Sequence, residues 1–420
     1  MTLASKGACV ALVALLVACS GPHVAPEPER TPLQQAVALR ETGRLDEAEK
    51  RLQALAVEGD ARAELELAET LMLRGKHAQA VALLKERYKI NQDDADLAGI
   101  VARALDGAGK PDEAAPAYVK RLQLHPRDVP AALRLAELLV GRGDLVGACM
   151  VAEAALRMEP NHPGLHTALS RALLGRGRVP QALEHAKQAA QLAPEDASSW
   201  LQMAQVQILA GDLEAAKEAL QKCLKIDSQH AEALRDLGVL MLELGDTKEA
   251  VALLKRATQV VPDSAVAWTA LGVARHRQGD LVGAMASLEH ACRLNPHAPA
   301  IYANLAEVAL DDGFPRRAVT EARKARDHLG ASATADLRQR IERLHTRAVV
   351  VALLADALCR NDKDGAALQQ TAERELHDAG LDAYLPEIPK VGDQATVAVR
   401  AAHARCRSAA PPSDPRPPSP

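Results

Sequence analysis

The segment around Gly107 has residue types that can hold a phosphate group. Gly107, Gly109 and Lys110 resemble the glycine-rich loop that binds phosphates through backbone N–H groups and a lysine. However, Ala104 stands where the first glycine of that loop belongs, and Pro111 follows the lysine in place of serine or threonine. The segment therefore predicts a turn between helices, and no nucleotide or other cofactor is expected.

Two histidines, His162 and His166, have the four-residue spacing that can place metal ligands on one face of a helix. Pro163 and Gly164 lie between them and disfavour the helix that such a site would need. The chain also lacks HExxH, paired CxxC and GxSxG motifs. The sequence therefore predicts no metal site, no catalytic residue and no enzyme.

The overall charge and the aromatic content argue against nucleic-acid binding. The chain has 51 Lys and Arg against 55 Asp and Glu, so it offers no excess of positive charge to phosphates. Two Trp, four Tyr and one Phe in 420 residues are too few for base-stacking surfaces. Proteins are the more plausible class of partner.

A regular series of glycines indicates how the chain is built. Their spacing is 32 residues once and 34 residues seven times. We call these nine residues the glycine ladder: Gly43, Gly75, Gly109, Gly143, Gly177, Gly211, Gly245, Gly279 and Gly313. A fixed period of this length is typical of a repeat array, in which each unit buries its apolar face against its neighbours.

Other positions keep the same phase as the ladder. A small residue stands seven residues before each glycine, and an alanine stands five residues after each one. Prolines follow by seventeen residues in five repeats: Pro126, Pro160, Pro194, Pro262 and Pro296. Apolar residues between these marks recur at steps of three and four, which predicts helices. Each unit is therefore expected to run helix, glycine turn, helix, second turn.

This pattern resembles the tetratricopeptide repeat (TPR) family, in which W-x2-L-G is followed by A-x3-F and then P. One repeat shows it with Trp268, Leu271, Gly272, Ala284, Leu288 and Pro296. The resemblance implies an all-α TPR superhelix, an α-solenoid of about nine helix-turn-helix repeats over residues 33–330, with C-terminal capping helices. The repeat with Gly99 and Gly107 in its first helix and Pro116 in its second departs most, and we expect a kink or soft joint there.

The N-terminus resembles a bacterial lipoprotein signal. An apolar run from Ala8 to Ala18 is too short to span a bilayer but has the length of a signal-peptide core. Leu16 to Cys19 resembles the lipobox, so residues 1–18 are expected to be removed and Cys19 lipidated; a plain secretory signal is the alternative. Ser20 in place of aspartate favours the outer membrane. Residues 19–32 then form the lipidated cysteine and a proline-rich tether facing the periplasm.

The remaining cysteines divide into two groups. Cys149, Cys223 and Cys292 occupy apolar positions on second helices, where free cysteine acts as a small hydrophobe. Cys359 and Cys406 lie beyond the repeats, in a compartment that permits disulfides. Either a disulfide between them or two free thiols fits the sequence.

The chain after the repeats is expected to cap the array. Residues 331–360 form a capping helix, residues 361–408 a helical C-terminal module and residues 409–420 a disordered proline-rich tail. The capping segment has a basic face that includes Arg340, Arg343 and Arg347. That face is either a solvated surface or a site for an anionic partner.

In TPR proteins the first helices line a concave groove, so the resemblance also indicates lining residues. Counted from the ladder, they include Arg171, Leu201, Gln205, Arg235, Val239 and Thr269. These positions lack the Lys and Asn of the carboxylate clamp found in chaperone-binding members. Their mixed polar and apolar character suits an extended or helical segment of an envelope protein.

These features together predict an outer-membrane lipoprotein that scaffolds a cell-envelope machine, such as a type IV pilus secretin, gliding-motility, secretion or polysaccharide-export assembly. One alternative is an adaptor that recruits periplasmic cell-wall enzymes or proteases. A second, from another class, is an enzyme or glycan-binding module within residues 361–408, where Tyr384 is the one aromatic residue.

Overall fold

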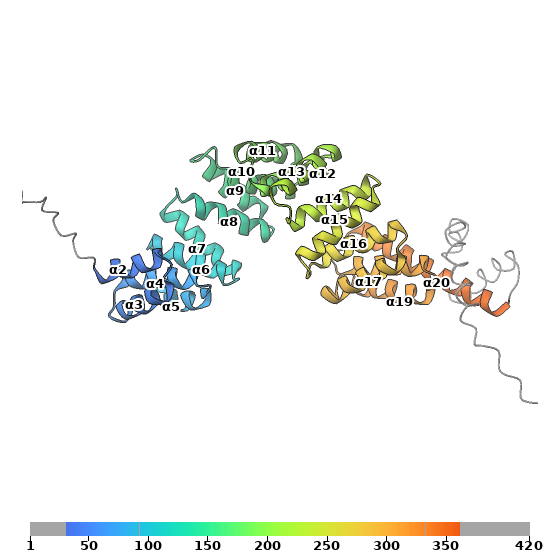
Figure 1. The fold of residues 1–420 in the computed structure, drawn as a ribbon, viewed down its shortest axis with the longest axis horizontal. Helices are drawn as coiled ribbons and strands as arrows, with labels where there is room; N and C mark the ends of the chain where they lie inside the picture. The colour runs from blue at the N-terminus through green and yellow to red at the C-terminus, as the bar shows by residue number, and fades with distance from the viewer. Residues whose placement is uncertain (1–30, 92, 332, 362–420) are drawn as a thin grey trace, which may run out of the picture. The chain divides into compact units, whose positions relative to one another are not determined.

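The computed structural model describes residues 31–91, 93–331 and 333–361, and within them every regular element is an α-helix (Figure 1). The all-α prediction is therefore confirmed. The chain divides into two compact units, of which unit 1 ends at Arg176 and unit 2 begins at Gly177. Each unit is a stack of antiparallel helix pairs.

Unit 1 contains four helix pairs followed by one further helix. We call the helix before a ladder glycine a first helix and the helix after it a second helix. The bounds are α2 Pro32–Glu41, α3 Leu45–Val57, α4 Ala61–Leu73, α5 His77–Ile90, α6 Ala95–Gly107, α7 Pro111–Leu124, α8 Val129–Gly141, α9 Leu145–Leu156 and α10 Pro163–Gly175.

Unit 2 begins with a second helix, continues with four pairs and ends with a long helix. The bounds are α11 Val179–Leu192, α12 Ala197–Ala210, α13 Leu213–Ile226, α14 Ala231–Glu243, α15 Thr247–Val260, α16 Ala265–Gln278, α17 Leu281–Leu294, α18 Pro299–Asp311, α19 Pro315–Asp327 and α20 Ala335–Asn361. The final helix, α20, packs against α18 and α19.

The glycine ladder marks the turn inside each pair. All nine glycines have φ between 71° and 90°, a left-handed conformation that other residues adopt only with strain. At Gly211, for example, the backbone N–H donates to Ile208 O at 3.0 Å and the turn ends α12. The ladder therefore reflects a requirement of backbone conformation.

The small residues beside the ladder have a different role, which is to let paired helices approach. All nine alanines five residues after the glycines are fully buried. Seven residues before Gly245, a Cβ added to Gly238 would lie 2.6 Å from Leu254 Cγ on the partner helix. The pair α14 and α15 is thus closer than one extra methyl group would allow.

A hydrogen bond joins consecutive repeats at the proline turns. Trp200 Nε1 donates to Pro194 O at 2.8 Å, and Trp268 Nε1 donates to Pro262 O at 2.7 Å. Tyr302 makes the same bond to Pro296 O, and a ring nitrogen of His166 lies 2.8 Å from Pro160 O. Position eleven before the ladder glycine therefore carries a ring that holds the preceding turn in four repeats.

The start of the array needs a small adjustment. The first helix begins at Pro32, which the sequence analysis assigned to the tether; Thr31 caps the helix, and proline suits its first position because no N–H is required there. Gly99 lies within α6 and Pro116 within α7, both of which are continuous helices, and the kink or soft joint expected there stays a prediction. In the part of the chain that is described, no helix is long and apolar enough to cross a membrane.

Candidate functional site

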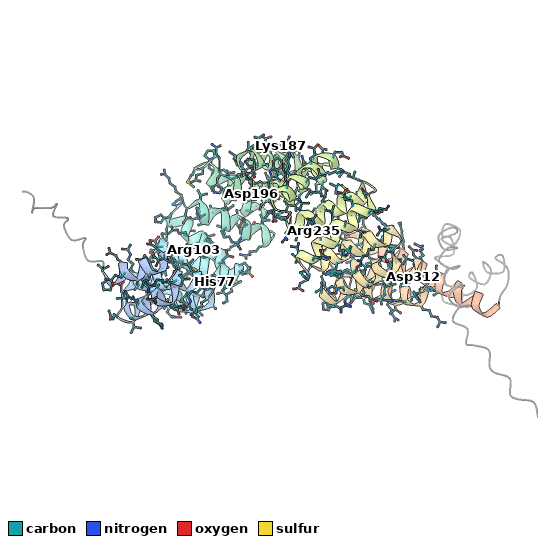
Figure 2. The ribbon with its side chains drawn as sticks, in the orientation of Figure 1. His77, Arg103, Lys187, Asp196, Arg235 and Asp312 are labelled. Carbon is teal, nitrogen blue, oxygen red and sulfur yellow. The ribbon has the colours of Figure 1, made fainter. Side chains whose placement is uncertain are left out.

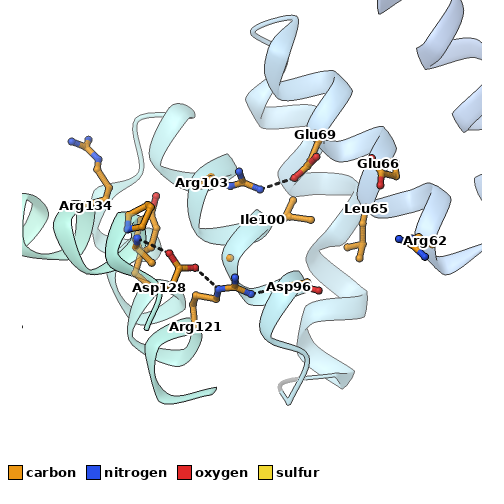
Figure 3. Close-up of a pocket in the computed structure, with 14 residues that line it drawn as sticks. Arg62, Leu65, Glu66, Glu69, Asp96, Ile100, Arg103, Arg121, Asp128 and Arg134 are labelled. Carbon is orange, nitrogen blue, oxygen red and sulfur yellow. Dashed lines mark hydrogen bonds and ion pairs between the residues drawn. The ribbon is translucent and has the colours of Figure 1, made fainter. Parts of the chain in front are cut away.

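A cavity of about 640 Å³ lies across three successive first helices of unit 1, namely α4, α6 and α8 (Figure 3). Its middle helix, α6, belongs to the repeat that departs most from the TPR pattern. Second helix α7 supplies Tyr118 and Arg121 to the same cavity. We call it the unit 1 cavity, and its remaining lining residues are Arg62, Leu65, Glu66, Glu69, Asp96, Gly99, Ile100, Arg103, Asp128, Pro130, Ala131 and Arg134.

Gly99 explains why residues of a second helix reach this surface. It stands ten residues before its ladder glycine, where the neighbouring repeats have Leu65 and Leu133. A Cβ at Gly99 would lie 3.3 Å from Arg121 Cδ, which is tighter than an ordinary contact. The missing side chain therefore gives Arg121 room beside α6.

Arg121 holds two acidic residues of the cavity together. Its Nη1 donates to Asp96 at 2.8 Å, and its Nε donates to Asp128 at 2.6 Å. Asp128 also accepts a bond from the backbone N–H of Ala131 and so caps α8. Burial opposes ionisation of Asp128, but the Ala131 and Arg121 hydrogen bonds outweigh it and lower its pKa. Arg121 likewise keeps a raised pKa despite burial, because both carboxylates bond to it.

A second set of ion pairs crosses the repeats. Glu69 accepts from Arg103 at 2.7 Å and from Arg40 at 2.7 Å. Arg134 donates to both carboxylate oxygens of Asp106, and also to Glu137 at 2.8 Å. These contacts join α2, α4, α6 and α8, so the charges are held by neighbouring repeats.

Tyr118 is a buried aromatic residue of the cavity. Its side chain is 4% exposed, and burial followed by the charge of Asp106 raises the pKa of its phenol to about 12. The hydroxyl stays protonated at neutral pH and can donate a hydrogen bond. The cavity thus combines fixed guanidinium groups, a neutral phenol and the apolar side chains of Leu65 and Ile100.

The predicted groove residues lie on first helices of both units, and Figure 2 locates Arg235 on α14. Leu201 is buried in the core of unit 2, whereas Val239 is partly exposed. Gln205 donates to Asp236, and Arg235 pairs with the same carboxylate at 2.7 Å. Thr269 donates to a backbone oxygen of its own helix, and Arg171 is exposed on α10. Their role in binding stays a prediction.

The basic face of α20 is partly neutralised from within the chain. Arg340 donates to Glu307 at 3.0 Å and to Asn304 at 2.8 Å. Arg347 lies 3.9 Å from Asp311, and Arg343 is exposed. Two of the three predicted arginines therefore have partners on α18, which suits a solvated capping face better than an anion site.

The cysteines of the repeats behave as packing residues. Cys149 and Cys223 are buried, Cys292 is half-buried, and all three are free thiols. Burial raises the pKa of Cys223 and of Cys292 to about 11, so neither forms a thiolate readily. Cys19, Cys406 and the side chain of Cys359 lie outside the described residues, so lipidation and disulfide pairing stay predictions.

The argument from Pro163 against a helix between the two histidines was wrong. Pro163 takes the first position of α10, where a missing N–H costs nothing, and His166 lies inside that helix. The histidines still have separate roles. A ring nitrogen of His162 accepts from Leu165 N and caps the helix, while His166 bonds to Pro160 O. Within residues 31–91, 93–331 and 333–361, no cluster of three or more His, Cys, Asp or Glu side chains can hold a metal.

Sequence reasoning did not find the unit 1 cavity, although a signal for it exists. Six residues before successive ladder glycines stand Glu69, Arg103, Glu137 and Arg171, which alternate in charge. The absence of a side chain at Gly99 falls in the same stretch. An alternating series at one lining position, together with a glycine at the next, would have indicated a charged cavity.

Two family descriptions match the sequence. The tetratricopeptide repeat matches residues 33–95 and 102–163, and the C-terminal domain of cilia and flagella-associated protein 70 matches residues 163–328. A search of curated proteins finds no match.

Solved structures of helical repeats superpose on the chain. The APC/C hetero-tetramer Cut9-Hcn1 matches with a TM-score of 0.53 at 18% identity, over 73% of this chain and 59% of that chain. This chain therefore spans less than two thirds of the length of that one. A tetratricopeptide repeat protein from Parabacteroides merdae gives a TM-score of 0.46 at 14% identity, over 58% and 96% of the two chains. MamA from Desulfovibrio magneticus gives 0.37 at 23%, over 40% and 94%. The Cut9-Hcn1 superposition shows a shared fold.

Proposed function

Because this chain belongs to the tetratricopeptide repeat family, we propose that it is a protein-protein interaction scaffold that a lipid on Cys19 anchors to the outer membrane, facing the periplasm. Proteins of this family are typically non-enzymatic scaffolds that hold peptide segments of their partners in a groove. The array would serve the assembly or stability of a cell-envelope machine of the pilus, motility, secretion or polysaccharide-export type.

One observation carries the scaffold part of this proposal. The unit 1 cavity lies across the first helices of three repeats, the surface on which the family holds its partners. Its charged side chains are fixed by pairs between repeats, such as Arg103 with Glu69. A surface that is already ordered loses less side-chain entropy when a partner binds.

The membrane part rests on the N-terminal sequence. Ala8 to Ala18 and Cys19 have the order of a lipoprotein signal, and a single lipid-modified cysteine would place the array at the membrane surface. Ser20 directs the proposal to the outer membrane. The proline-rich residues before Thr31 would then separate the helices from the lipid.

The anchor is tested by metabolic labelling with palmitate and by separation of envelope fractions. The full chain should incorporate label and sediment with outer membranes, whereas Cys19→Ala should lose the label. A matched control is Cys149→Ala, which removes a buried cysteine and should keep both properties. Unlabelled wild-type protein in the soluble periplasm would refute the lipoprotein proposal.

The scaffold is tested by crosslinking in intact cells and purification of the lipidated full chain. Envelope proteins should be recovered reproducibly, and their identity would name the machine. Recovery of periplasmic hydrolases in their place would favour the adaptor alternative. Recovery of no reproducible envelope protein would refute the scaffold proposal.

A further inference from the structure

Two side chains of the unit 1 cavity are hydrogen-bond donors without a partner. The Arg62 side chain is exposed and makes no ion pair or hydrogen bond within residues 31–91, 93–331 and 333–361, although the Arg62 backbone N–H donates to Asp60. The Tyr118 hydroxyl has no hydrogen-bond partner in that part of the chain either, although its side chain is 4% exposed. The Tyr118 oxygen is not among the fully buried polar atoms that lack a partner, so the hydroxyl is accessible although most of the residue is buried. Both groups are available as donors.

Most carboxylates in and beside the cavity already bond to arginines. Glu66 differs, because its Oε2 lies 2.7 Å from Arg40 Nη1 as an ion pair but is buried without a hydrogen-bond partner. Glu69 accepts from Arg40 and Arg103, and both carboxylate oxygens of Asp106 accept from Arg134. Asp128 accepts from Arg121 and from a backbone N–H of α8. A positively charged ligand would have to compete with these arginines everywhere except at Glu66 and Asp96.

The charges are also layered. The Arg103 side chain is 54% exposed while its partner Glu69 is 31% exposed, and Arg134 is 45% exposed above Asp106 at 16%. The guanidinium groups are therefore outermost in both pairs. The order is reversed at Asp96, which is 76% exposed against 18% for Arg121, and at Glu66, which is 21% exposed against 15% for Arg40.

The guanidinium groups are spread along the cavity. Figure 3 shows Arg62 and Arg134 at opposite ends of the labelled side chains, with Arg103 and Arg121 between them. Packed helices lie about 8–10 Å apart, so arginines on successive first helices match carboxylates three residues apart in an extended polyproline II chain, where they share a face about 9 Å apart. One isolated carboxylate would satisfy only part of this surface.

We propose that the unit 1 cavity, opened by the absence of a side chain at Gly99, binds an acidic, extended peptide segment of the partner protein. Carboxylates of that segment bond to Arg62 and Arg103, and the Tyr118 hydroxyl donates to one of them. This inference rests on the proposed scaffold function and specifies the chemistry of the partner. Leu84 stands at the same repeat position as Tyr118 and has no hydroxyl, so the proposal also gives Tyr118 a binding role that leucine could not have.

The test uses the full chain and two fluorescent probes, a blocked hexaglutamate peptide and a blocked hexalysine peptide. Fluorescence anisotropy should detect hexaglutamate binding that weakens as salt increases, and no comparable hexalysine binding. Arg103→Ala should weaken hexaglutamate affinity about tenfold or more, since a bond to a charged group is lost. Tyr118→Phe keeps the buried ring and should weaken it by about twofold to tenfold.

Gly99→Leu distinguishes binding of hexaglutamate in the cavity from its general attraction to basic surfaces. It restores the residue found at this position in Leu65 and Leu133 and changes no charge, but its side chain would fill the cavity. Hexaglutamate binding should fall at least as far as in Arg103→Ala. The matched control is Lys187→Ala, an exposed cation on α11 outside the cavity (labelled in Figure 2), whose affinity should equal that of wild type.

Equal binding of both probes, or unchanged hexaglutamate binding in Gly99→Leu and Tyr118→Phe, would overturn the inference. Circular dichroism of each variant should match wild type, and Tyr118→Phe provides the test if Gly99→Leu does not fold. Envelope capture is independent of these peptides. If the lipidated chain captures envelope partners but does not bind hexaglutamate, the inference is refuted and the scaffold proposal is not. If the chain binds hexaglutamate but captures no partner, the scaffold proposal is refuted.

Discussion

Gly238 and Gly245 belong to one repeat but are glycine for different reasons, and this difference can be measured. In Gly238→Ala, the new Cβ would lie 2.6 Å from Leu254 Cγ and 3.4 Å from the Ala250 carbonyl oxygen. Carbon atoms in ordinary contact are about 3.5–4.0 Å apart. Leu254 is fully buried, so a shift of its side chain would disturb the packing around it.

The magnitude follows from two opposing effects. Overpacking by a methyl group costs about 1–3 kcal/mol, whereas replacing a helical glycine by alanine gains about 1 kcal/mol. We therefore expect Gly238→Ala to change the stability of α14 and α15 by about 0–2 kcal/mol in the unfavourable direction. In a Leu254→Ala background the clash disappears, and the same substitution should stabilise by about 1 kcal/mol.

Gly245→Ala is the matched control. Its φ is 90°, and no atom lies within 4 Å of an added Cβ, so strain in the backbone is the expected cost. That cost is about 1–2 kcal/mol and should be equal in both backgrounds, because Leu254 is not involved. The two glycines thus differ in their coupling to Leu254.

Hydrogen exchange of the full chain, read on peptides from α14 and α15, measures these local stabilities. A double-mutant cycle should give a coupling of about 1–3 kcal/mol between positions 238 and 254 and none between 245 and 254. If Gly238→Ala has the same effect in both backgrounds, helix contact is not the reason for glycine at position 238. The fully buried Ala204, at the same position of the preceding repeat, shows that the repeat itself does not demand glycine.

Three further predictions concern single contacts. Trp268→Phe should lower the stability of its repeat by about 0.5–1.5 kcal/mol in hydrogen exchange, because the bond from Nε1 to Pro262 O is lost; an unchanged rate would refute this role. The Cys223 thiol, with a pKa raised to about 11, should react slowly with iodoacetamide at pH 8 in the folded chain and rapidly in urea; equal rates would contradict its burial. The pKa of Asp128 is lowered in the folded chain, so its pair with Arg121 stabilises α7 and α8 at pH values above the ordinary carboxyl pKa of 3.8. This stabilisation is lost as the pH falls through the folded pKa, and protection of α7 and α8 from hydrogen exchange should fall with it. Asp128→Asn keeps the helix cap but has no carboxylate to protonate, so its loss of protection in acid should be smaller.

Much of the fold could be predicted from spacing because its causes are local. A left-handed turn requires glycine, and the ladder accordingly coincides with positive φ at all nine positions. The alanine five residues later is buried every time, since it faces the partner helix at a fixed distance along the chain. His166 was misjudged because proline was treated only as a helix breaker, although Pro163 begins α10.

The site could be predicted only in part. Counting from the ladder places Arg103 and Leu201 on equivalent lining helices, yet Leu201 is buried in a core and Arg103 is exposed in a cavity. The capping arginines illustrate the same limit, because Arg340 pairs with Glu307 on another helix. Position in a repeat predicts the face of a helix but not its neighbours.

The sequence by itself determined the period, the two helices of each repeat and the turns between them, because each depends on residues close together in the chain. Only the tertiary structure decided which lining side chains are accessible and which are neutralised. The bond between Arg103 and Glu69 joins residues 34 apart, and Arg121 lies so near Gly99 on another helix that a Cβ there would make a tight contact with it. Such contacts depend on how helices pack, and helical periodicity carries no information about the residues that meet across that packing.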